Sequence, residues 1–66
     1  MYIEKFTAHV RDLTSKKSFK IVLDENDPQE AHKKIYNKLN NYQEIVKLTN
    51  HDNEVVYNID SGFINN

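Results

Sequence analysis

Three histidines are the side chains of this sequence with the widest chemistry, because an imidazole can bind a metal or transfer a proton near neutral pH. They are His9, His32 and His51, so no two have the i, i+4 spacing that places two metal ligands on one helix face. The sequence has no cysteine to complete such a site or to act as a thiolate nucleophile. His51 and Asp52 together make only a weak metal pair in a turn. We therefore expect solvent-exposed histidines, no metal site and no cofactor.

The carboxylates gather between Asp24 and Glu30, and paired carboxylates can act as general acid and base where burial separates their pKa values. Here a helix start already explains Asp27 and Glu30. The three serines lie outside any nucleophile elbow, and no glycine-rich loop is present to hold a phosphate. A chain this short has little room for a concave pocket of about 300 Å³ or more. We expect no enzyme and assign no catalytic residue.

Length and charge restrict the remaining function classes. Sixty-six residues form one domain at most, which we place at 1–66, and the formal net charge is −1. That charge argues against a protein whose main task is to neutralise a nucleic-acid backbone. Without a secretory signal or an apolar stretch approaching the ~20 residues of a membrane span, we expect a soluble, cytoplasmic protein with no membrane partner. The excess of lysine, asparagine and isoleucine is typical of AT-rich genomes, such as those of low-GC bacteria and their phages.

The clearest local signal is a helix at about 28–40. Asp27 is suited to cap the free N–H groups of the first turn, Pro28 suits the first helical position, and Glu30 completes a capping box. An apolar stripe recurs every four residues: Ala31, Ile35 and Leu39. The asparagines at 40 and 41 can end the helix.

Apolar and polar residues alternate with the period of a strand in four other segments. We expect strands at residues 2–10, 18–24, 42–49 and 54–60. A polar connection at 11–17 makes the first two strands a hairpin, and a polar turn at 50–53 joins the last two. The tail at 61–66 either docks on the sheet or frays.

The resulting order, ββαββ, predicts an α+β fold in which one helix covers one face of a four-stranded sheet. This order and size resemble the β-grasp arrangement of the small immunoglobulin-binding domains of bacterial proteins G and L. The resemblance implies that the first and last strands run parallel in the centre of the sheet, with strands two and three at its edges. An antiparallel meander with one helix is the alternative.

Lysines form the first surface that could bind a partner. Together they could contact phosphates, with Tyr36 or Tyr42 available for stacking on bases. The lysines concerned are Lys16, Lys17, Lys20, Lys33, Lys34 and Lys38. The chain has one arginine, the residue usually used for bidentate contacts, and lysines also commonly fill the wet side of a helix.

The sheet face that the helix leaves open forms the second such surface. Each expected strand places one β-branched apolar residue there: Ile3, Val22, Ile45 and Val56. An apolar band rimmed by polar groups is typical of an association site, although these residues also suit any pleated surface. A sheet edge bordered by Val22 and Lys20 offers a second route, in which a partner adds a strand, while Lys20 protects that edge against random pairing.

We therefore expect a small non-enzymatic protein-interaction or regulatory module that binds a protein partner or forms a homodimer. An accessory protein of a phage or mobile element suits this size and composition. The alternative is a small nucleic-acid-binding protein that uses the lysines of the first hairpin and the helix.

Overall fold

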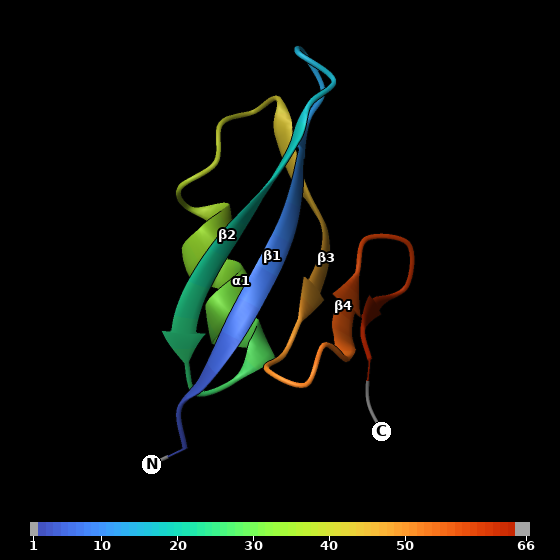
Figure 1. The fold of residues 1–66 in the computed structure, drawn as a ribbon. Coiled ribbons are helices and arrows are strands. Elements are labelled where there is room, and N and C mark those ends of the chain that lie inside the picture. Colours follow the sequence, from blue (N-terminus) through green and yellow to red (C-terminus); the bar gives the residue numbers. More distant parts are fainter. Residues whose placement is uncertain (1, 65–66) are drawn as a thin grey trace.

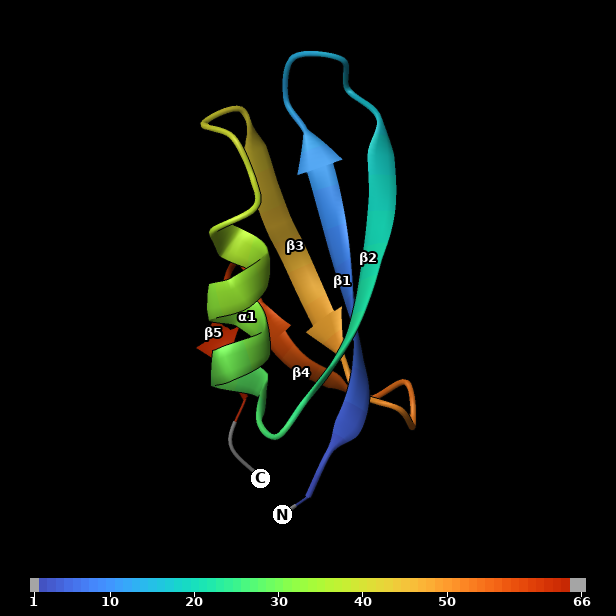
Figure 2. The same cartoon turned by 90° about the vertical axis from the view of Figure 1, so that its left-hand side faces the viewer.

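The computed structural model describes residues 2–64 and has an α+β fold (Figure 1). Its elements follow the predicted ββαββ order, with one short strand added at the end. They are β1 (Glu4–Asp12), β2 (Ser18–Glu25), α1 (Pro28–Tyr36), β3 (Gln43–Thr49), β4 (Val55–Asn58) and β5 (Gly62–Phe63). The helix packs on one face of the sheet and leaves the other face uncovered (Figure 2).

The sheet is antiparallel throughout, with the strand order β2-β1-β3-β4-β5. The parallel centre that the β-grasp resemblance implied is not formed, because β1 pairs with β3 and not with the last long strand. β2 and β3 lie on either side of β1, and α1 connects them across it. Both arrangements share one element order, so the order alone does not show which strand joins β1.

The short strand β5 occupies part of the tail that was expected to dock or fray. Phe63 lies opposite Tyr57 of β4, and Gly62 at the start of β5 has a φ of 80°, which favours glycine. The last two residues of the predicted tail, 65–66, lie outside the described part of the chain.

The helix begins as its sequence predicts. Asp27 caps it, and the Asp27 Oδ1 atom accepts a hydrogen bond of 2.8 Å from the Glu30 N–H. It ends at Tyr36, earlier than expected. The Asn37 N–H still bonds four residues back, to the Lys33 carbonyl, but the N–H groups of Lys38 and Leu39 bond three residues back, to the carbonyls of Ile35 and Tyr36. Leu39 still packs against the core from this tighter turn.

The core lies between the helix and the covered face of the sheet. Its buried side chains come from β1, α1 and β3: Phe6, Ala8, Val10, Ala31, Ile35, Ile45 and Leu48. Because alternate residues of β1 fill it, the other residues of that strand face the open side.

Two bulges interrupt the alternation in the second half of the chain. In β3, Ile45 lies opposite Val10 and Lys47 lies opposite His9, so Val46 is an extra residue between them. In β4, Tyr57 lies opposite Leu48 and Val55 lies opposite Thr49, which leaves Val56 as the second extra residue. Each bulge reverses which side of the sheet the following residues face.

An aromatic cluster holds the β4–β5 hairpin against the helix. The His32 ring lies 4.5 Å from the ring of Tyr57 and 5.4 Å from that of Phe63, and it stacks on Tyr36 at 6.1 Å. The expectation that His32 is solvent-exposed is therefore wrong: the hairpin partly covers the ring, and burial lowers its pKa.

Candidate interaction surface at the edge of the sheet

The predicted apolar band does not form on the open face. Ile45 is only 4% exposed and belongs to the core, and Val56 is half-buried and packs against it. Ile3 and Val22 do lie in the open, at 53% and 55% exposed. The cause of the error is the pair of bulges: alternation counted back from Leu48 places Ile45 on the open side, whereas the extra residue Val46 puts Ile45 on the same side as Leu48, in the core.

The open face carries a polar and mostly cationic row instead. Lys20, His9 and Lys47 lie opposite one another on three neighbouring strands. Burial lowers the pKa of His9, and the charges of Lys47 and Lys20 lower it further. In the row nearest the β1–β2 turn, Arg11 donates a hydrogen bond of 2.6 Å to Glu44. This face has the composition of a solvated surface rather than that of an apolar contact patch.

The lysines of the nucleic-acid alternative are divided between different parts of the molecule. Lys20 lies on the open face, because it is opposite His9, while Lys33, Lys34 and Lys38 belong to the helix layer on the other side. Lys16 and Lys17 lie in the turn between β1 and β2. These six lysines do not gather on one surface.

Lys34 is also engaged within the fold. Its ammonium group forms an ion pair with Glu25, a residue that is only 7% exposed at the end of β2. The Lys34 hydrogen bond lowers the pKa of Glu25, and the Asn26 N–H, which donates a bond of 3.1 Å to the carboxylate, lowers it further. This pair fastens the helix to the strand beside it.

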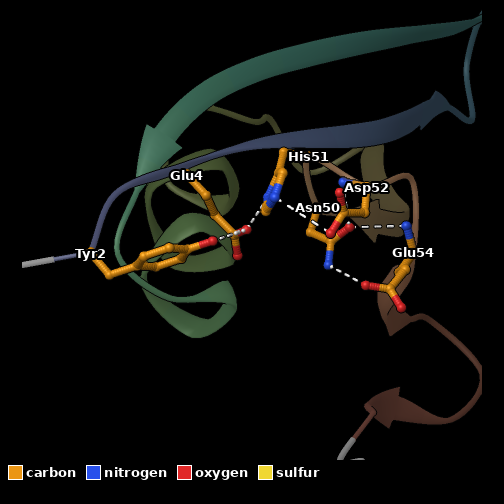
Figure 3. Close-up of polar contacts among 6 residues, drawn as sticks. All are labelled: Tyr2, Glu4, Asn50, His51, Asp52 and Glu54. Carbon is orange, nitrogen blue, oxygen red and sulfur yellow. Dashed lines mark hydrogen bonds and ion pairs between the residues drawn. The ribbon is translucent and has the colours of Figure 1, made fainter.

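A second polar cluster ties the start of β1 to the β3–β4 loop (Figure 3). The Nδ1 atom of His51 forms a contact with the Glu4 carboxylate, which also accepts a bond of 3.1 Å from the Tyr2 hydroxyl. Desolvation raises the pKa of Tyr2, and the Glu4 carboxylate raises it further. These contacts join two chain segments that are far apart in the sequence.

Asn50 closes the loop itself. Its side-chain oxygen accepts hydrogen bonds from the backbone N–H groups of Asp52, at 2.9 Å, and of Glu54, at 3.0 Å. Its amide nitrogen donates to the Glu54 carboxylate at 3.1 Å. This is the hydrogen-bonding pattern of an asparagine that shapes a turn. Among residues 2–64, no group of three or more histidine or carboxylate side chains is arranged to hold a metal ion.

The described part of the chain encloses no pocket, and none of its helices is long and apolar enough to cross a membrane. The surfaces that the sheet itself exposes are its open face and its two edges, β2 and β5.

The two edges of the sheet differ in length and regularity. β5 is two residues long and follows a strand that contains a bulge. β2 is eight residues long and pairs with β1 without any shift in register. Long, regular edge strands are the ones to which another strand can add, and short or bulged strands prevent it. The expectation that strand two is an edge is correct, whereas strand three lies inside the sheet, between β1 and β4.

The backbone groups that β2 presents outward follow from its pairing with β1. The Asp12 N–H donates a hydrogen bond of 2.8 Å to the Lys17 carbonyl, so the backbone groups of Lys17 point toward β1. In an antiparallel ladder the backbone groups of every second residue then do the same. Lys20, Val22 and Asp24 therefore direct their N–H and C=O groups away from the sheet.

The side chains of β2 make this edge amphipathic. On the helix side it carries Phe19, which is 40% exposed, and the half-buried Ile21 and Leu23. On the open side Val22 lies between two exposed charges of opposite sign, Lys20 and Asp24. Asp24 and Phe19 were not among the predicted interface residues, although the alternation along this strand places both residues on these sides.

Comparison of this chain with protein-family models, with curated proteins and with solved structures finds no match.

Proposed function

We propose that this chain is a non-enzymatic protein-interaction module that binds an extended protein segment along the free edge of β2. The observation that carries the proposal is the contrast between the two edges: eight regular residues at β2 against two at β5. In binding of this kind, main-chain hydrogen bonds supply affinity and alternate side chains supply specificity.

The edge is a better candidate than the open face. The apolar residues that would have formed a contact patch on that face are reduced to Ile3 and Val22, and charged side chains fill much of the rest. At the edge, by contrast, unpaired backbone groups and partly exposed apolar side chains occur together along the same strand. Lys20 limits indiscriminate pairing, so the edge favours partners that offer a matching charge.

The test is to replace Val22 by proline. Its N–H points away from β1, so proline removes no hydrogen bond within the sheet but blocks the addition of a strand. Val22→Thr is the matched control, because threonine keeps both the N–H group and the β-branched shape. Circular dichroism of each variant checks that the fold is retained.

Each protein is then immobilised and exposed to an extract of its source cell. We expect Val22→Thr to retain the same partner as the unaltered chain, and Val22→Pro to lose it while keeping its fold. A partner retained equally by Val22→Pro would contradict the proposal. Unfolding of Val22→Pro would contradict it as well, because the N–H at position 22 would then be needed inside the sheet.

A further inference from the structure

The sequence of β2 complements itself when the strand runs antiparallel to a second copy with Val22 opposite Val22. In that register Lys20 lies opposite Asp24 of the second copy, and Asp24 lies opposite its Lys20. Ile21 lies opposite Leu23 of the second copy, on the helix side. Opposite charges and paired apolar residues are the cross-strand combinations that stabilise a sheet. We infer that the segment bound at the edge of β2 is the same strand of a second copy, an inference that rests on the proposed function.

The neighbouring registers lack this match. Residues that lie opposite each other in neighbouring strands point to the same side of the sheet. When two copies of β2 pair about a two-fold axis, the axis must therefore pass beside one residue, which lies opposite its own copy. If that residue is Ile21, Lys20 lies opposite Val22 and its charge has no partner. If it is Leu23, Val22 lies opposite Asp24, and if it is Lys20, two lysines oppose each other. Only the register centred on Val22 pairs both charges on the open side.

The backbone agrees with this register. Lys20, Val22 and Asp24 present their N–H and C=O groups outward, so these residues form the hydrogen-bonded pairs of the new ladder. The same three residues carry the charge match and the exposed valine. Backbone pairing and side-chain pairing therefore involve the same positions.

The second copy would bring its helix to the same side of the joined sheet, because the two-fold axis is perpendicular to that sheet. α1 contacts β2 as well as β1 and β3, so the two helices would both lie on strands next to the junction. Phe19 then lies opposite Glu25 of the second copy, whose carboxylate Lys34 already holds within its own chain. The two sheets join into one continuous sheet.

Mixing two charge variants tests this register. In Lys20→Asp both facing pairs become acidic, and in Asp24→Lys both become basic, so each variant alone is repelled by its own copy. A mixed dimer of the two variants has an acidic chain facing a basic one, and both pairs attract again. The double variant Lys20→Asp/Asp24→Lys restores attraction within a single species. If the double variant associates, neither substitution prevents folding, because both are present in the same chain.

Association is measured by sedimentation of the pure proteins across a concentration series at low salt. We expect the unaltered chain to dimerise, and each single variant to associate at least about tenfold more weakly, since two pairs change from attraction to repulsion. The equimolar mixture and the double variant recover most of this loss. Lys38→Asp is the control for net charge, because it makes the same charge change at an exposed residue of the helix layer, and it leaves association unchanged.

Three results would overturn the inference. The first is an unaltered chain that stays monomeric at every concentration. The second is a mixture that associates no better than the single variants, and the third is a control that weakens association as much as Lys20→Asp does. A monomeric chain that still retains another protein, and loses it in Val22→Pro, would leave the proposed function standing and remove only the self-pairing.

Discussion

Replacing Ile45 by valine removes one methylene group from the core, and the same replacement at Ile3 provides a matched control. Sequence alternation places both residues on the open face, whereas the structure leaves Ile45 4% exposed and Ile3 53% exposed. A buried isoleucine-to-valine change costs about 0.5–1.5 kcal/mol of unfolding free energy. At an exposed site the change is expected to stay within about 0.5 kcal/mol.

These free energies are large enough to measure in so small a domain. In a chain of this size 1 kcal/mol shifts the melting temperature by about 4–8 °C, so Ile45→Val should melt roughly 2–12 °C lower. Urea unfolding of both variants at one protein concentration gives the free energies, and an unchanged m-value shows that neither variant alters the unfolded state. Equal effects of the two replacements, or a larger effect of Ile3→Val, would refute the bulge at Val46 and with it the assignment of Ile45 to the core.

Three further predictions concern contacts that hold the helix. Because the folded pKa of Glu25 is lowered, its ion pair stabilises the fold above the unfolded value of about 4.3, and this contribution is lost as the pH falls through and below that value. When the unfolding free energy is measured with urea over a pH series, Glu25→Gln should lose less of it at acid pH than the unaltered chain does. The lowered pKa of His32 means that the unfolded state binds the proton more readily, so stability falls as the pH drops below about 6.5. His32→Phe should remove most of that loss of stability and leave the part due to His9, whose pKa is also lowered. A loss of stability of undiminished size would exclude His32 as its source. Asp27→Ala should cost about 1 kcal/mol of unfolding free energy through loss of the helix cap, and no measurable loss would show that the cap is not formed.

Local signals in the sequence were sufficient for the helix start and for the order of the elements. Asp27, Pro28 and Glu30 act over three residues, so their effect does not depend on the rest of the fold. The alternation along β1 and β2 also holds in the structure, because these two strands pair without interruption. β2 was therefore identified correctly both as a strand and as an edge.

The features that the sequence did not reveal depend on contacts between distant segments. The bulges at Val46 and Val56 arise from the fit of β3 to its neighbours, and valine suits either side of a sheet equally well. The pairing of β1 with β3 likewise depends on the path of α1, which carries the chain from β2 across β1 to β3. His32 has a place in an aromatic cluster only because the short strand β5 brings Phe63 beside it. The open-face band is absent for the first of these reasons. Val22 and Lys20 lie on the predicted side of β2, because β2 pairs with β1 without a bulge.

Amide hydrogen exchange along β2, measured by NMR at low and high protein concentration, is the most direct test of strand pairing at this edge. We expect the amides of Phe19, Ile21 and Leu23, which face β1, to be protected at both concentrations. The amides of Lys20, Val22 and Asp24 should exchange rapidly in dilute solution and become protected as the concentration rises. If those three amides exchange equally fast at every concentration, self-pairing at this edge is wrong. If they are already protected in the dilute monomer, β2 is not a free edge and the proposed function fails with it.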